Sequence, residues 1–141
     1  MKLVICEKPS VGAAVAAALG VTGKKDGYIE NDKYIISWCI GHLVQLSEAA
    51  AYGEQYRKWS YDSLPILPQE WQYTVAADKG KQFKILKDLM HRADVSEVVN
   101  ACDAGREGEL IFRFVYHQAG CKKPFTLSLI HISEPTRPLY I

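Results

Sequence analysis

The chain has 141 residues, of which 48% are hydrophobic and 23% charged, and its formal net charge is +1. This composition is ordinary for a globular domain. Such a small charge excludes a globally basic nucleic-acid binder, so any surface for nucleic acid must be local. The longest apolar run is too short to cross a bilayer, and the first residues lack a secretory signal, so we expect a cytoplasmic protein without a membrane partner.

Four cysteines, at positions 6, 39, 102 and 121, form no CxxC pair. Cys6 and Cys102 lie in apolar runs, where a free cysteine behaves as a small hydrophobic residue. We therefore expect buried thiols, because neither a zinc site nor a disulfide framework is favoured by this spacing.

The first part of the chain predicts a strand, a helix and a hairpin. Residues 2–6 (KLVIC) form an apolar, β-branched run suited to a buried strand. Ser10 is placed to cap a helix that Gly20 would end, and the small residues between them would allow close packing on a sheet. Residues 27–41 predict two strands around a turn at Asn31.

The second part alternates strands with helices. Residues 47–68 give a mixed signal, whereas residues 71–76 and 96–102 are strand-like. Helical spacing predicts helices over residues 79–93 and 106–119. The inward face of the second helix is predicted to hold Leu110, Ile111, Phe114 and Val115. This alternation predicts an α/β fold with a parallel sheet and right-handed crossovers.

Two predicted strands end in acidic residues. Glu7 follows the first strand, Asp103 follows the strand of residues 96–102, and Glu107 lies one helical turn further on. Sites in open parallel sheets form at the carboxyl ends of strands, so neighbouring strands would bring these three carboxylates together. Gly105 would permit the tight turn between them. Taken singly, each acid is better explained as a solvated strand end, a helix cap or a partner of the helix dipole.

Three neighbouring carboxylates need a compensating charge, because like charges oppose joint ionisation. Mg²⁺ is a hard cation that binds a few carboxylates together with water and a phosphate. Lys8 and Arg106 flank the acids and are suited to holding that phosphate. The group therefore predicts phosphoryl transfer at a nucleic-acid backbone, with Mg²⁺ as the cofactor.

Two motifs and three linking segments resemble a known family. VICEKPSVG at residues 4–12 and ACDAGREGEL at residues 101–110 resemble the Toprim domain of type IA DNA topoisomerases, in the bacterial topoisomerase III group. Between them, SWCIGHLVQL, YRKWSYDSLPILP and KGKQFKILKDLMHRADV resemble the same group in the same order. The resemblance covers residues 1–125. It implies an α/β Toprim domain with a roughly four-stranded parallel sheet flanked by helices and with an inserted hairpin.

The resemblance also implies roles for single residues. The family has a glutamate at the first strand end, matched by Glu7, and a DxDxE pattern matched by Asp103 and Glu107. Gly105 replaces the second aspartate, which weakens any two-metal scheme. One Mg²⁺ held by Glu7 and Asp103, with Glu107 assisting, is what the resemblance implies here. Glu7 would be the acid–base catalyst, and Lys8 would bind the scissile phosphate.

Arg106 would orient the acids or the DNA backbone. Trp59 follows two cationic residues and lies where the family contacts DNA, and an indole beside cations can stack a base. A core tryptophan is an equally good interpretation. His42 is interpreted as a strand-end histidine outside the site, and Lys79 and Lys81 as a solvated helix start.

In this family a tyrosine attacks a phosphodiester of single-stranded DNA, becomes linked to the 5′ phosphate, and the break is resealed without ATP after strand passage. None of the eight tyrosines matches the motif of that nucleophile. The resemblance thus implies an incomplete enzyme, inactive alone, which relaxes or decatenates DNA with the remaining topoisomerase domains. Two alternatives stay open: a standalone Toprim nuclease or primase-like protein, and a non-catalytic nucleic-acid-binding module.

Residues 126–141 depart from the family pattern. Their sequence, TLSLIHISEPTRPLYI, resembles translated sequencing-adapter sequence, so we treat them as a suspect tail and a gene-model artefact. Residues 128–133 alternate well enough to form a last strand.

Overall fold

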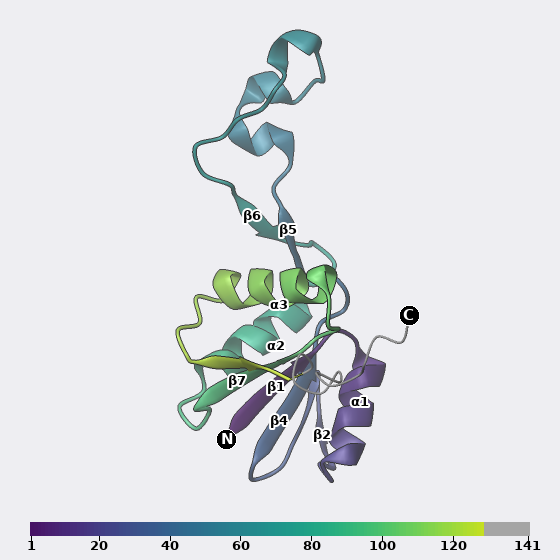
Figure 1. Cartoon of the computed structure of the whole chain (residues 1–141). Coiled ribbons are helices and arrows are strands. Elements are labelled where there is room, and N and C mark those ends of the chain that lie inside the picture. The colour runs from purple at the N-terminus through teal and green to yellow at the C-terminus, as the bar shows by residue number, and fades with distance from the viewer. Residues whose placement is uncertain (129–141) are drawn as a thin grey trace, which may run out of the picture.

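The computed structural model describes residues 1–128 and builds them around a six-stranded sheet (Figure 1). The strand order is β2-β3-β4-β1-β7-β8, in which β4, β1, β7 and β8 are parallel and β2 and β3 extend the sheet antiparallel. The strands are β1 (Lys2–Cys6), β2 (Gly23–Lys25), β3 (Tyr28–Glu30), β4 (Tyr34–Trp38), β7 (Glu97–Ala101) and β8 (Phe125–Leu127). The predicted four-stranded parallel sheet is confirmed.

The predicted hairpin is also confirmed, as β3 and β4. The side-chain oxygen of Asn31 accepts hydrogen bonds from the backbone N–H groups of Lys33 and Tyr34, at 2.9 and 2.8 Å. An asparagine that bonds its own backbone in this way stabilises a turn. Strand β2, which the sequence did not predict, pairs with β3 at the sheet edge.

Three helices cover the two faces of the sheet. Helix α1 (Pro9–Ala18) lies on one face, and helices α2 (Gly80–His91) and α3 (Arg106–Gln118) lie on the other (Figure 1). Alternate residues of β1 therefore enter different cores: Leu3 and Ile5 join the side chains of α2 and α3, whereas Val4 and Cys6 join those of α1. This alternation follows from the two-residue period of a strand.

Two local predictions for the helices are wrong. Helix α1 begins at Pro9, with Lys8 rather than Ser10 as its N-cap, because the fixed φ of proline suits the first helical position. In α3 the buried face holds Gly108, Ile111, Phe112, Val115 and Tyr116. Leu110 is 38% exposed, so the inward face is rotated from the predicted one.

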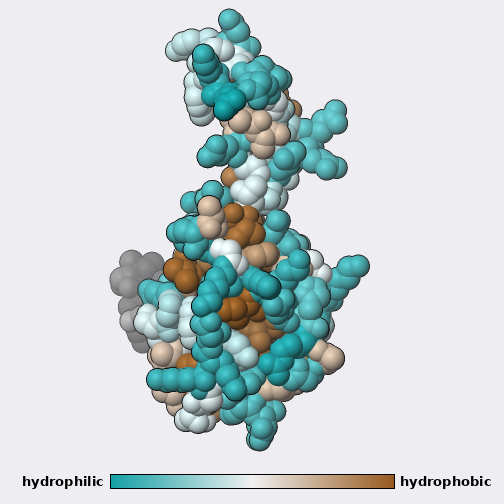
Figure 2. Space-filling model, turned by 180° about the vertical axis from the view of Figure 1, so that it is seen from behind, coloured by the Kyte–Doolittle hydropathy of each residue, from teal (hydrophilic) through white to brown (hydrophobic). Residues whose placement is uncertain are grey.

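A segment that we call the arm, residues 44–75, projects from the sheet domain (Figure 1). Its base is an antiparallel ribbon of β5 (Val44–Leu46) and β6 (Tyr73–Val75), and its outer part holds three short 3₁₀ helices with no buried residue. The 3₁₀ helices are η1 (Ala49–Tyr52), η2 (Glu54–Tyr56) and η3 (Tyr61–Ser63). Seen from behind, the arm is largely hydrophilic, whereas hydrophobic side chains gather on the domain below it (Figure 2).

No helix within residues 1–128 has the length and apolarity needed to cross a membrane. The boundary predicted after residue 125 falls inside β8. The rest of the suspect tail from residue 129 onward, and with it most of the last strand predicted over 128–133, lies outside the described residues.

Candidate metal and nucleic-acid site

Glu7 and Asp103 lie together at the carboxyl edge of the sheet. Strands β1 and β7 are parallel neighbours whose last residues, Cys6 and Ala101, are paired in register. The backbone N–H of Asp103 donates to a carboxylate oxygen of Glu7 at 3.4 Å. Glu7 is half-buried and Asp103 exposed, so both carboxylates are accessible from the same edge.

Glu107 has a different partner. Its carboxylate contacts Nε2 of His42, which follows strand β4 on the other side of β1. Within residues 1–128 no three His, Cys, Asp or Glu side chains are grouped so that they could hold a metal ion. The structure thus brings Glu7 and Asp103 together, but it does not bring Glu107 to the same point.

His42 is a member of this edge that sequence reasoning excluded. Its backbone carbonyl accepts a hydrogen bond from Nζ of Lys79 at 3.1 Å, so Lys79 is not the freely solvated helix start that was predicted. The sequence does show a histidine four residues after the end of β4. This position indicates a place beside the acids only once β4 is known to neighbour β1. The contact with Glu107 makes His42 a polar neighbour of the acids.

The glycine on which the turn after β7 depends is Gly108, not Gly105. Gly105 has an extended backbone with φ −179°, and a Cβ there would meet nothing within 4 Å. A Cβ at Gly108 would lie 2.2 Å from the carbonyl oxygen of Asp103. Gly108 therefore allows the first turn of α3 to touch the backbone of Asp103.

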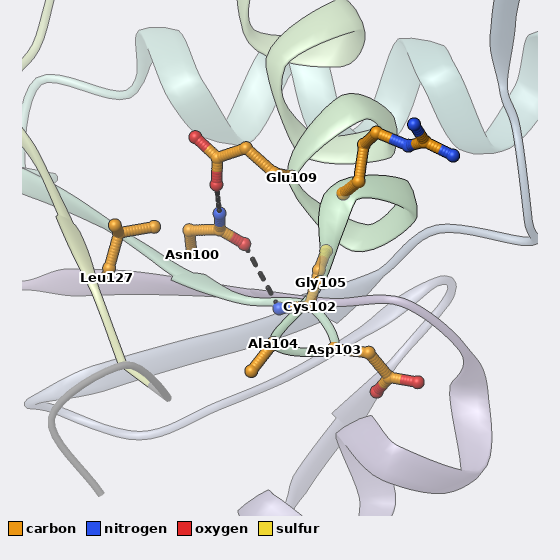
Figure 3. A pocket seen from close by; sticks show the side chains of 8 residues that line it. Asn100, Cys102, Asp103, Ala104, Gly105, Glu109 and Leu127 are labelled. Atoms are coloured by element: carbon orange, nitrogen blue, oxygen red, sulfur yellow. Dashed lines mark hydrogen bonds between the residues drawn. The ribbon is translucent and has the colours of Figure 1, made fainter. Parts of the chain in front are cut away.

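A cavity of about 510 Å³ lies beside this turn, between the ends of β7 and β8 and the start of α3. It is lined by Asn100, Cys102, Asp103, Ala104, Gly105, Arg106, Glu109 and Leu127. In Figure 3 the Asp103 side chain points away from Asn100 and Glu109, which face each other across a hydrogen bond. The turn thus separates the Asp103 carboxylate from the Glu109 carboxylate.

Lys8 and Arg106 lie at the starts of two helices. Lys8 is the N-cap of α1, Arg106 is the first residue of α3, and both are exposed. Neither side chain forms an ion pair within the described part of the chain. These two cations lie at helix N-termini beside Glu7 and Asp103, at what we call the acidic edge. They are suited to binding a polyanion that also binds a metal.

Trp59 belongs to the arm and not to the core. Its side chain is 80% exposed, which removes the interpretation as a core tryptophan. Arg57, one of the two preceding cations, pairs with Glu54 at 2.9 Å. The exposed indole is therefore available for stacking on a base.

Three buried cysteines lie at the ends of the central parallel strands, next to the acidic edge. Cys6, Cys39 and Cys102 end or follow β1, β4 and β7, and these three and Cys121 are buried free thiols, as predicted. Burial raises the pKa of Cys6 to about 12, and a hydrogen bond with Cys39 together with burial raises the pKa of Cys102. Cys6 and Cys102 are therefore protonated thiols at neutral pH and behave as small core residues.

The fold and this edge define a class of protein: an α/β domain with a central parallel sheet whose neighbouring strands are followed by accessible acids and exposed cations. The chain belongs to the Toprim domain family, whose sequence profile matches residues 2–133.

Several bacterial proteins named DNA topoisomerase 3 are similar to the chain. The protein from Staphylococcus haemolyticus is 43% identical over 135 residues, which are 96% of this chain and 19% of that protein. The protein from Shouchella clausii is 46% identical over 123 residues, 87% of this chain and 17% of that protein. The Bacillus subtilis protein is 43% identical over 122 residues, with 86 and 17% covered. The chain thus spans less than a fifth of the length of these relatives.

Proposed function

We propose that this chain is the Toprim part of a bacterial type IA, topoisomerase III-like enzyme that cleaves and religates single-stranded DNA without ATP. The observation that carries the proposal is the pairing of Glu7 with Asp103 at the ends of neighbouring parallel strands. The relatives named DNA topoisomerase 3 support it. The longer protein would relax or decatenate DNA at the nucleoid, in the cytoplasm.

Glu7 and Asp103 are proposed to hold one Mg²⁺. Their carboxylate oxygens are the hard donors that Mg²⁺ prefers, and both side chains are accessible at the edge. A bound Mg²⁺ supplies positive charge against a DNA phosphate. Glu107 has a side chain that is 70% exposed, and it would assist by giving up its contact with His42 and turning to the metal.

Glu7, Lys8 and Arg106 are proposed to act directly on the DNA during cleavage and religation. Glu7 would take a proton from solvent on the carboxylate oxygen that Mg²⁺ leaves free and give it to the 3′ oxygen as that oxygen leaves, while the attacking tyrosine loses its own proton to solvent; both transfers reverse on religation. Lys8 binds the scissile phosphate and Arg106 the adjoining backbone, where the helix N-termini add positive potential. The nucleophilic tyrosine is proposed to belong to another part of the longer protein, so this chain alone should not relax DNA.

The first prediction concerns Mg²⁺. Glu7→Gln and Asp103→Asn should each weaken Mg²⁺ binding to the chain by at least about tenfold, because even outer-shell partners of a metal cost this much when removed. Isothermal titration calorimetry with MgCl₂ measures the affinity. Glu70→Gln, which removes an exposed carboxylate of the arm, is the control and should bind like the unmodified chain.

Wild-type affinity in both site variants would show that the metal assignment is wrong. Mg²⁺-dependent nicking of DNA by the chain alone, lost in Glu7→Gln, would favour the standalone nuclease instead.

The second prediction concerns Trp59. Trp59→Ala should weaken binding of a short single-stranded oligonucleotide by about 1–3 kcal/mol, the contribution of one stacked base. The stability of the Trp59→Ala chain should equal that of the unmodified chain, because the Trp59 side chain is 80% exposed. Fluorescence anisotropy at fixed salt measures binding. Trp71→Ala is the control, because that indole on the same arm already packs edge-on against Tyr52; equal losses in both variants would contradict a specific role for Trp59.

A further inference from the structure

Asn100 is a buried polar residue next to the turn that joins β7 to α3 and carries Asp103, which we call the acidic turn. It lies in β7 and is 4% exposed. Its amide oxygen accepts from the backbone N–H of Cys102 at 3.1 Å, and its amide nitrogen donates to Oε2 of Glu109 at 2.9 Å (Figure 3). The other oxygen of Glu109 accepts from Nε of Arg113 at 2.7 Å. A continuous chain of hydrogen bonds therefore joins the end of β7 to α3.

The orientation of the amide is fixed by its partners. The N–H of Cys102 only donates, and an ionised Glu109 carboxylate only accepts. The oxygen of Asn100 must therefore face Cys102, and its NH₂ group must face Glu109. A side chain of the same shape without these groups would leave the buried N–H of Cys102 without its partner, which is costly.

These contacts hold the acidic turn at both ends. Cys102 directly precedes Asp103, and Glu109 lies two residues beyond Glu107. Gly108 brings the same helix turn against the Asp103 backbone. Glu109 is held on the side away from the Asp103 side chain, so its carboxylate is engaged in this support.

We propose that Asn100 is a positioning residue: through Cys102 and Glu109 it holds the β7–α3 turn where Asp103 lies beside Glu7. The proposal rests on the proposed function in one respect, namely that Asp103 binds Mg²⁺. It divides the acids of DAGREGE by role, with Asp103 and Glu107 at the metal and Glu109 in the support of the turn. Asn100 touches neither metal nor DNA in this scheme.

The test uses two changes that preserve net charge. Asn100→Leu keeps the size of the side chain and removes both hydrogen bonds. The double variant Asn100→Asp with Glu109→Gln exchanges donor and acceptor. The new carboxylate at position 100 accepts from Cys102 and from the new amide nitrogen at position 109, while the new amide oxygen at position 109 still accepts from Arg113. The double variant therefore retains every contact with the polarity of one of them reversed.

Two quantities are measured on the 141-residue chain. The first is Mg²⁺ affinity, which Asn100→Leu should lower by about tenfold, at the lower end of outer-shell effects, and which the double variant should restore. The second is hydrogen exchange of the Cys102 and Asp103 amides without metal, which should quicken in Asn100→Leu and return in the double variant. Gln82→Leu removes another buried amide, whose hydrogen bonds go to Gly27, Ser37 and Trp38 and not to the β7–α3 turn, so it should lower stability without changing Mg²⁺ affinity.

The outcomes separate the two proposals. Wild-type Mg²⁺ affinity in Asn100→Leu, or unchanged exchange at Cys102, would overturn the positioning role while leaving the proposed function intact. If the unmodified chain binds no Mg²⁺, the proposed function fails, and the exchange rates alone decide whether Asn100 holds the turn. If Asn100→Leu does not fold, Glu109→Gln is used instead, because it disturbs the same hydrogen bonds from the side of α3. It should lower Mg²⁺ affinity by less than about tenfold and quicken amide exchange at Cys102 and Asp103 to a smaller extent.

Discussion

Replacing Gly108 with alanine is expected to destabilise the domain by about 3 kcal/mol, the upper part of the usual range for overpacking. The new methyl group would lie 2.2 Å from the carbonyl oxygen, 2.8 Å from the nitrogen and 3.0 Å from the carbonyl carbon of Asp103. All three are backbone atoms, so no side-chain rotation relieves the clash. The turn or the first part of α3 must shift, and Mg²⁺ binding at Asp103 should be lost with it.

Gly105→Ala is the matched control, three residues away in the same turn. Its backbone is extended and nothing lies within 4 Å of the added Cβ, so stability and Mg²⁺ affinity should stay close to those of the unmodified chain. Urea denaturation and calorimetric titration measure the two quantities. A Gly108→Ala chain as stable as Gly105→Ala would refute the close approach of α3 to Asp103.

A second large effect is expected at Phe112, where alanine should cost about 4 kcal/mol, as for other buried aromatic residues. Phe112 is fully buried, and its ring centroid lies 5.8 Å from that of Tyr116 and 5.3 Å from that of Phe125. Because Phe125 begins β8, the cavity would loosen the contact between α3 and the last strand of the sheet as well as the core.

Leu110→Ala provides the comparison on the same helix. Leu110 is 38% exposed, so truncation should cost less than about 1 kcal/mol. Chemical denaturation of both variants distinguishes the observed buried face of α3 from the predicted one. Similar losses at the two positions would favour the predicted face.

The sequence was sufficient for a parallel sheet centred on β1 and β7 because these two strands carry their own signals. The run of β1 is apolar after Lys2, β7 holds the apolar pair Val98 and Val99, and α2 and α3 repeat apolar residues at helical spacing. Strands β2, β5 and β8 were missed because each is only three residues long, so their pairing depends on neighbours that sequence does not reveal. Leu110 was placed inward because periodicity gives a helix face only approximately.

At the edge of the sheet, the meeting of Glu7 with Asp103 was predictable, because parallel neighbouring strands end together. The contact between His42 and Glu107 was not, because it joins residues 65 apart whose side-chain directions depend on strand order. The tight turn was assigned to Gly105, and Gly108 was overlooked, for a similar reason. A sequence shows that a residue is glycine, whereas only the tertiary structure shows which glycine another backbone touches.

The arm begins and ends at the same place. The backbone N–H of Ala76 donates to the carbonyl of Leu43 at 2.9 Å, so the chain leaves and re-enters the sheet domain through adjacent residues. The chain entropy lost on closing such a loop grows slowly with its length, by about 0.6 kcal/mol for each doubling. Evolution can therefore lengthen, shorten or exchange the outer arm as a module, changing what it contacts while the sheet and its acidic edge keep their geometry.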